Sequence, residues 1–172
     1  MKRHLALAVS AAFVLATSAW AADATVTLAA ASGSKAAGTI NFTKADGGLH
    51  VTGDVTGLTP GEHGFHLHEK GDCSAPDATS AGDHWNPGKQ AHGAPTAAAH
   101  HAGDLGNITA DASGKAHVDT TVKGIGLDGE TSVIGHAVIV HGKADDLKTQ
   151  PSGAAGPRVA CGVVASAGAV SH

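Results

Sequence analysis

Six histidines and one aspartate stand at spacings that could hold two neighbouring metal ions. They are His66, His68, His84, His92, His101, Asp104 and His141. His66 and His68 are two positions apart, so on an extended strand both imidazoles would project from one face, roughly 7 Å apart. Imidazole suits zinc and copper, and a carboxylate among the imidazoles favours zinc. The pattern therefore predicts two adjacent metal sites, with zinc favoured at one of them.

These candidate ligands lie on separate segments that a compact fold has to bring together. His66 and His68 belong to the expected strand 64–68, and His141 ends an apolar run at 137–140 that is typical of a buried strand. Most of the others fall in 69–103, which is far longer than an ordinary connection. Loops of that length are usually functional or disordered, and the imidazoles inside this one favour a functional loop.

A lone histidine is more often a solvated or hydrogen-bonded side chain than a metal ligand. We interpret the remaining histidines of the chain after residue 21 in this way: His50, His63, His100, His117, His136 and His172.

Short β-like runs separated by turn signals make up the rest of the chain. Alternating apolar and polar residues predict half-buried strands at 24–30, 38–44 and 49–55. Asp46-Gly47-Gly48 and Ser113-Gly114 are typical of hairpin turns. Further strands are expected at 64–68, 107–109, 115–122, 133–141 and 158–165. Eight antiparallel strands predict an all-β sandwich or flattened barrel, with two long functional loops at 69–103 and 142–157.

The first 21 residues predict a secretory signal peptide. Lys2 and Arg3 form its charged start, 5–17 its apolar centre, and Ala19-Trp20-Ala21 a cleavage site. The alternative, a retained membrane anchor, is disfavoured because the apolar centre is too short to span a bilayer. We therefore expect a single domain over 22–172 that is exported and has no membrane association after cleavage.

Charge and cysteine content limit which partners and which covalent bonds are expected. The formal net charge is −4 and no basic run is present, which argues against nucleic acid as a partner. The two cysteines, Cys73 and Cys161, are expected to form one disulfide in an exported protein. The alternative, two metal thiolates, is weaker because the histidines already supply a full ligand set.

Six motifs in this order resemble those of the copper/zinc superoxide dismutases, and the resemblance covers nearly all of the chain after the leader. The matching segments are 57–69, 82–87, 92–95, 101–107, 141–147 and 156–162. Together with the predicted signal peptide, the resemblance implies the bacterial exported, periplasmic type. The family is itself a known example of a sandwich architecture, so the resemblance implies an eight-stranded antiparallel Greek-key β-sandwich or barrel, immunoglobulin-like in its layers.

By position, the resemblance implies the role of each site residue. Copper would be bound by His66, His68, His84 and His141, and zinc by His84, His92, His101 and Asp104, with one ion of each per subunit. His84 would bridge both ions. His100 is the alternative to His101, which is preferred because its spacing to Asp104 fits the family. Asp145 would accept hydrogen bonds from His66 and His92, orienting one ligand of each ion.

The implied function is dismutation of superoxide to dioxygen and hydrogen peroxide in the periplasm, which would protect the cell envelope. Arg158 and His84 would be the catalytic residues, with Arg158 attracting the superoxide anion. The loop 142–157 is shorter than its eukaryotic counterpart, so guiding roles are not transferred to its lysines.

Two other classes of function compete with this one. A metal-storage or metallochaperone domain could use the same fold. An adhesion-type sandwich would explain the strands but would leave the ordered ligands unexplained. The sequence leaves open whether the protein is a monomer or a homodimer.

Overall fold

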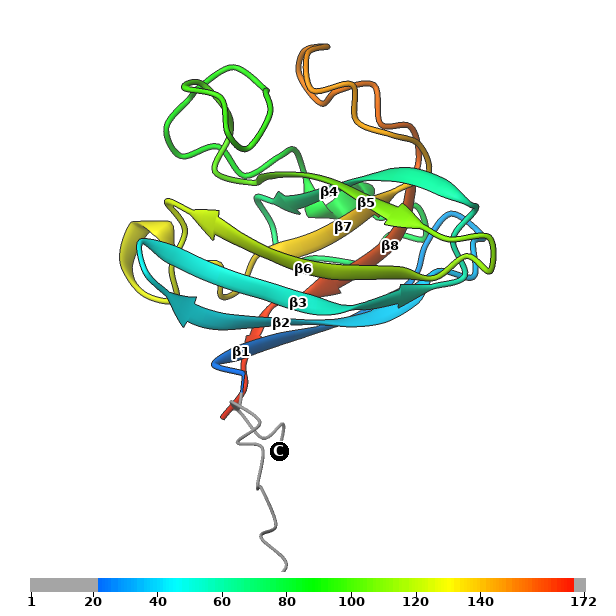
Figure 1. The fold of residues 1–172 in the computed structure, drawn as a ribbon, viewed down its shortest axis with the longest axis horizontal. Helices are drawn as coiled ribbons and strands as arrows, with labels where there is room; N and C mark the ends of the chain where they lie inside the picture. The colour runs from blue at the N-terminus through cyan, green and yellow to red at the C-terminus, as the bar shows by residue number, and fades with distance from the viewer. Residues whose placement is uncertain (1–21, 169–172) are drawn as a thin grey trace, which may run out of the picture.

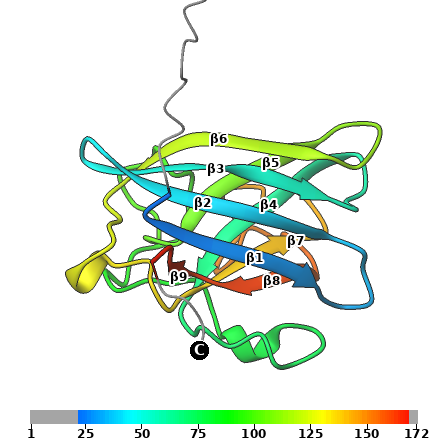
Figure 2. The same cartoon turned by 90° about the horizontal axis from the view of Figure 1, so that it is seen from below.

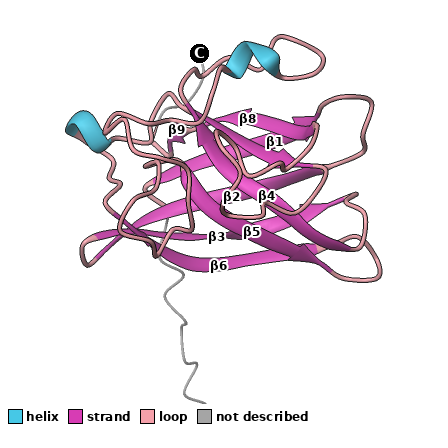
Figure 3. Cartoon of the chain, turned by 90° about the horizontal axis from the view of Figure 1, so that it is seen from above, coloured by secondary structure: helices cyan, strands magenta, loops and turns pink. Residues whose placement is uncertain are grey.

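The structure is a computed structural model that describes residues 22–168, so the predicted signal segment 1–21 and His172 lie outside the described residues. Strands dominate the described part, with only two short 3-10 helices (Figures 1 and 3). In chain order the elements are β1 (Ala24–Ala30), β2 (Ala37–Ala45), β3 (Gly48–Thr56), β4 (Gly61–His68), η1 (Thr79–Ala81), β5 (Asp104–Ala110), β6 (Ala116–Lys123), η2 (Gly129–Thr131), β7 (Ala137–His141), β8 (Arg158–Val163) and β9 (Ala165–Ser166). Within residues 22–168 no helix is long and apolar enough to cross a membrane.

The strands close into an antiparallel barrel, which confirms the predicted all-β fold (Figure 2). Their order is β2-β3-β6-β5-β4-β7-β8-β1, and β1 pairs again with β2 to complete the circle. The short β9 adds only two residues at the start of β1. The predicted turn at Asp46 and Gly47 joins β2 to β3, and Gly47 adopts a φ of 73°, which favours glycine. Neighbours such as β3 and β6 are distant in sequence, as in a Greek key.

Three predicted strand starts were wrong by three or four residues. β4 begins at Gly61 rather than at 64. β5 begins at Asp104 rather than at 107, because Asp104 pairs with His66 across a register shift in β4. β7 begins at Ala137 rather than at 133, because Gly135 has a φ of 83° and a turn bonds the His136 N–H to the Val133 carbonyl. Turn residues thus interrupt the strand that was predicted to begin at 133.

Alternation along the strands gives the barrel wall an inner and an outer face, and at β4 and β7 both faces are buried. Inside, Phe65 and Leu67 of β4 meet Val138 and Val140 of β7 in the main core. Each such fully buried side chain contributes about 1.5–3 kcal/mol relative to an exposed one. The residues between them point outward, so His66 and His68 lie on the outer face of the wall. That outer face is also buried, because long loops cover it.

The loop 69–103 is fastened to the outer face of β7 and β8. Small side chains form a second apolar cluster there: Ala31, Ala78, Ala81, Ala137, Ile139 and Cys161, with Cys73 packed against it. The predicted disulfide is confirmed, joining Cys73 to Cys161 across 88 positions with a Cα–Cα distance of 5.8 Å. Figure 1 shows this loop and 142–157 both rising on the side of the barrel where β4, β5 and β7 lie. The fold therefore encloses a space between its outer wall and two loops.

Candidate metal centre

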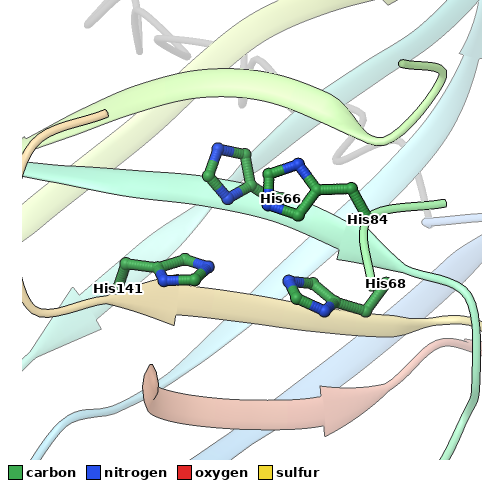
Figure 4. Close-up of side chains that lie close together, drawn as sticks. All are labelled: His66, His68, His84 and His141. Carbon is green, nitrogen blue, oxygen red and sulfur yellow. The ribbon is translucent and has the colours of Figure 1, made fainter. Parts of the chain in front are cut away.

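Two groups of buried side chains converge in that space. In each group the potential ligand atoms all lie within 4.8 Å of one another. The first group is His66, His68, His84 and His141, and the second is His84, His92, His101 and Asp104. The structure thus brings together every residue of the two predicted ligand sets, and His84 is shared. Figure 4 shows the four rings of the first group turned toward a common centre.

Strand geometry and one loop contact position the first group. His66 and His68 share the outer face of β4, with ring centroids 6.5 Å apart. His141 ends β7 at a register shift against β8, and such irregularities re-aim side chains next to functional sites. His84 reaches the same point from the loop 69–103 through an isolated bridge to His68.

Asp104 organises the second group. Its Oδ2 accepts hydrogen bonds from the backbone N–H groups of His101 at 2.8 Å and Gly93 at 3.1 Å. The other oxygen, Oδ1, is left to face the imidazoles. Its distances to Nδ1 are 2.8 Å for His84, 3.0 Å for His92 and 3.2 Å for His101. The chain therefore offers three nitrogens and one carboxylate oxygen at one point, which is a zinc-like donor set.

Outward hydrogen bonds fix which nitrogen of each ring faces the centre. His68 Nδ1 donates to the Gly82 carbonyl at 2.9 Å, and His141 Nδ1 donates to the Gly156 carbonyl at 3.1 Å. Since a neutral imidazole carries one N–H, the opposite nitrogen of each ring must present its lone pair inward. In the described part of the chain, five buried ring nitrogens have no hydrogen-bond partner: His66 Nδ1, His68 Nε2, His84 Nε2, His101 Nδ1 and His141 Nε2.

Such nitrogens are costly unless something binds them, because buried polar atoms are normally partnered. All five belong to the two groups, and four of them are the first group's inward-facing atoms. Imidazole nitrogens suit copper and zinc, and the mixed set with a carboxylate suits zinc. The residues present therefore fit one ion of each kind.

Burial keeps His66, His68 and His141 of the first group neutral, as metal ligands must be. Desolvation lowers the pKa of His66 to about 4, that of His68 to about 2 and that of His141 to about 3. For Asp104, burial alone would raise the pKa of the carboxyl. Hydrogen bonds from His84 and from the backbone of His101 and Gly93 outweigh burial, so its pKa lies well below the usual range and the carboxylate is charged.

Asp145 links the two groups from outside. Its Oδ2 lies 2.7 Å from His66 Nε2, and its Oδ1 lies 2.9 Å from His92 Nε2. Both imidazoles can donate to the one carboxylate, which directs Nδ1 of each ring toward its own group. Gly153, at a φ of 67°, lies so close that a Cβ there would overlap Asp145 Oδ1. The backbone of the loop 142–157 therefore covers the contact between Asp145 and His92.

Arg158 stands at the mouth of the first group. Together with His68, His84 and His141, it lines an open cavity of about 410 Å³. Its guanidinium donates to the carbonyls of Ala78 and Gly82, each at 2.6 Å. This cation contributes to the lowered pKa values of His68 and His141. A small anion entering the cavity would meet fixed positive charge beside the ring nitrogens.

Two of the six histidines that were interpreted from the sequence as ordinary side chains lie next to the site. His100 belongs to neither group, and its Nδ1 donates to the His101 carbonyl at 2.8 Å. His63 is buried, with ring nitrogens 2.7 Å from the His141 carbonyl and 2.8 Å from that of Thr59.

Sequence reasoning missed Asn107, whose side chain bonds both backbone groups of Asp145. The only signal for it was its place at the end of the motif 101–107.

Comparison with known proteins agrees with this geometry. The family model described as "Copper/zinc superoxide dismutase (SODC)" matches residues 36–164. The extracellular superoxide dismutase [Cu-Zn] of Brugia pahangi is 44% identical over 137 residues, covering 74% of this chain and 68% of the relative. Its counterpart in Caenorhabditis elegans is 44% identical over 133 residues, which cover 74% of this chain and only 60% of the relative's length. Superoxide dismutase [Cu-Zn] 2 of Mesembryanthemum crystallinum is 45% identical over 134 residues, with 74% and 85% covered.

Proposed function

This chain belongs to the copper/zinc superoxide dismutase family, and we propose that it converts two superoxide anions and two protons into dioxygen and hydrogen peroxide. We assign copper to His66, His68, His84 and His141, and zinc to His84, His92, His101 and Asp104. The observation that carries the assignment is the set of five buried ring nitrogens without partners, all turned into the two groups. Bound copper supplies the one-electron redox chemistry, since zinc has no redox role.

The residues around the cavity divide the remaining work. Arg158 attracts the superoxide anion and orients it with a fork of N–H donors, as planar guanidinium groups do for small oxyanions. Its two bonds to loop carbonyls hold the guanidinium at the cavity wall. Enzyme and substrate are both anionic overall, but charges beyond about 8 Å are largely screened at physiological salt. Within the cavity lining, the Arg158 cation lies beside the carboxylates of Glu69 and Asp83, so these near groups set the local field that superoxide meets.

His84 is the proposed proton carrier. It belongs to both groups, and its Nδ1 is held 2.8 Å from Asp104 Oδ1 while its buried Nε2 faces the first group without a partner. We assign Nε2 as the atom that takes up and returns one of the two protons consumed in each turnover. Asp104 and Asp145 keep the neighbouring rings in one orientation during that exchange.

The proposal also includes the finer identity of the protein. The nematode relatives are named extracellular enzymes, and the sequence carries a signal-like segment at 1–21. We propose export to the periplasm, with the mature protein beginning at Ala22 and acting as a single domain of the bacterial exported type. Mass spectrometry of the protein from a periplasmic extract tests this. A mass that still includes residues 1–21 would contradict it.

Metal analysis combined with an activity assay tests the function. The mature protein should bind one copper and one zinc per chain, and should consume superoxide when both are present. Stoichiometric metals without superoxide consumption would instead favour the metal-storage function.

A further inference from the structure

The side chain of Gln150 forms a two-point contact with the backbone of His92. Its Nε2 donates to the His92 carbonyl at 2.9 Å, and its Oε1 accepts from the His92 N–H at 2.8 Å. The two residues are 58 positions apart and come from different loops. One primary amide thus satisfies both backbone groups of a residue, as an edge strand would.

His92 depends on this contact because its own segment has no regular structure. It lies between β4 and β5 outside any strand or 3-10 helix, yet only 4% of its surface is exposed. Among the described residues, no backbone–backbone hydrogen bond of the loops involves His92. Buried backbone groups need partners, and for this residue Gln150 supplies both.

A matching contact holds the other side of the same ring. His92 Nε2 lies 2.9 Å from Asp145 Oδ1. The backbone of Asp145 is in turn bonded by Asn107, whose Oδ1 accepts at 2.8 Å and whose Nδ2 donates at 2.9 Å. Two side-chain amides therefore fix the two ends of the contact between His92 and Asp145.

We propose that Gln150 is a positioning residue for the zinc site, holding His92 so that its Nδ1 faces Asp104 and the other ligands. This rests on the proposed assignment of His92 to zinc. Without the contact, the His92 backbone would have to be ordered on metal binding, at a cost in affinity. Groups that orient metal ligands typically contribute 10–100-fold to metal affinity. Gln150 itself is exposed, so replacing it removes no core side chain.

Zinc release is the direct readout. Wild-type protein loaded with copper and zinc is mixed with a chromophoric chelator, and zinc transfer is followed in time. Gln150→Ala should release zinc about 10-fold faster or more, while copper content stays at the wild-type level. With cobalt(II) in place of zinc, the visible bands of Gln150→Ala should also differ from wild type, because ring orientation changes at the ion. A loss of stability alone would not alter those bands.

Gln90→Ala is the matched control. Gln90 is an exposed glutamine in the same loop as His92, and its Nε2 donates to the Gly88 carbonyl at 3.0 Å, away from the ligands. It should release zinc at the wild-type rate. Gln150→Glu keeps the acceptor for the His92 N–H but loses the donor, so its release rate should lie between wild type and alanine. It also decides the question if the alanine variant does not fold.

These experiments distinguish a failure of the proposed role of Gln150 from a failure of the proposed zinc site. Wild-type zinc release and wild-type cobalt bands in the Gln150 variants would overturn the positioning role while leaving the zinc site intact. A wild-type protein that binds no zinc would overturn the proposed zinc site itself.

Discussion

His84 Nδ1 lies 2.8 Å from Asp104 Oδ1, while Nε2 of the same ring faces three other histidines with no partner in the described chain. The two ring nitrogens of His84 therefore face different ligand groups. Replacing His84 should affect both groups, whereas replacing a ligand of one group should spare the other.

His84→Gln is expected to lose copper affinity and zinc affinity together, whereas His101→Gln should lose zinc affinity alone. The reason is that His84 belongs to both groups and His101 only to the second. Titration of each metal-free variant with copper and with zinc measures this. Unchanged zinc affinity in His84→Gln would contradict a shared ligand.

Asp145→Asn should weaken zinc binding by roughly 10–100-fold. An asparagine can accept one of the two N–H groups from His66 and His92, but its NH₂ group would oppose the other. Competition with a chelator of known affinity gives the change. Asp146→Asn is the control, because Asp146 is exposed and its side chain bonds only Lys148 and Thr149 of its own loop. Equal zinc affinity in the two variants would argue against a role for Asp145.

Arg158→Ala should lower kcat/KM by about 10-fold or more, because the cation at the cavity wall is lost. Arg158→Lys should recover part of the rate, since it keeps the charge but not the planar fork. Wild-type rates should fall with ionic strength, and the alanine variant should respond less. Stopped-flow rates at two salt concentrations measure both effects.

The structure adds a requirement to that test. The guanidinium also bonds the carbonyls of Ala78 and Gly82, so metal content must be measured beside the rates. Equal kcat/KM in the wild type and in metal-replete Arg158→Ala, at both salt concentrations, would show that Arg158 does not guide superoxide.

The strands could be predicted from the sequence because alternation is a local pattern, whereas the division of the seven candidate ligands into two sets came from the family resemblance. Alternation marks β1 to β3, and His66 and His68 share a face by spacing alone. The inward-facing nitrogen of each ring could not be predicted, since it depends on carbonyls such as Gly82 and Gly156 in remote loops. The contact between Gln150 and His92 could not be predicted either, because only the conformation of the two loops brings Gln150 next to the His92 backbone.

The metal-free protein should lose stability as the pH falls from about 6.5 toward 4. Burial lowers the pKa of His66 to about 4, that of His68 to about 2 and that of His141 to about 3. In this window these three histidines bind protons in the unfolded chain but not in the folded one, and together they outweigh His92, whose pKa is raised. The free energy of unfolding therefore decreases as the pH falls. Each histidine contributes up to about 1.4 kcal/mol per pH unit. The lowered pKa values of Asp104 and Asp145 act only below their ordinary range near pH 4.

Urea unfolding of the metal-free protein at pH 7.5 and pH 5.0 measures this effect. The midpoint should be lower at pH 5.0, and the difference should be smaller in His68→Gln, which lacks one of the three groups. A midpoint that rises on acidification would contradict the expectation.

Cys73→Ala with Cys161→Ala should lower the free energy of unfolding by about 2–5 kcal/mol. The disulfide closes a loop of 88 positions and fastens the segment that carries His84 to β8. Urea unfolding of the metal-loaded double variant against wild type gives the difference. Stability equal to wild type would show that the apolar cluster around Ile139 holds the loop without the bond.

The most direct test of the account is superoxide consumption by the mature protein, measured by stopped flow on samples of known metal content. The protein loaded with one copper and one zinc per chain should consume superoxide catalytically, with dioxygen and hydrogen peroxide as products. The protein with zinc alone should be inactive, since zinc supplies no redox step. Full occupancy by both metals without catalytic consumption of superoxide would contradict the central claim.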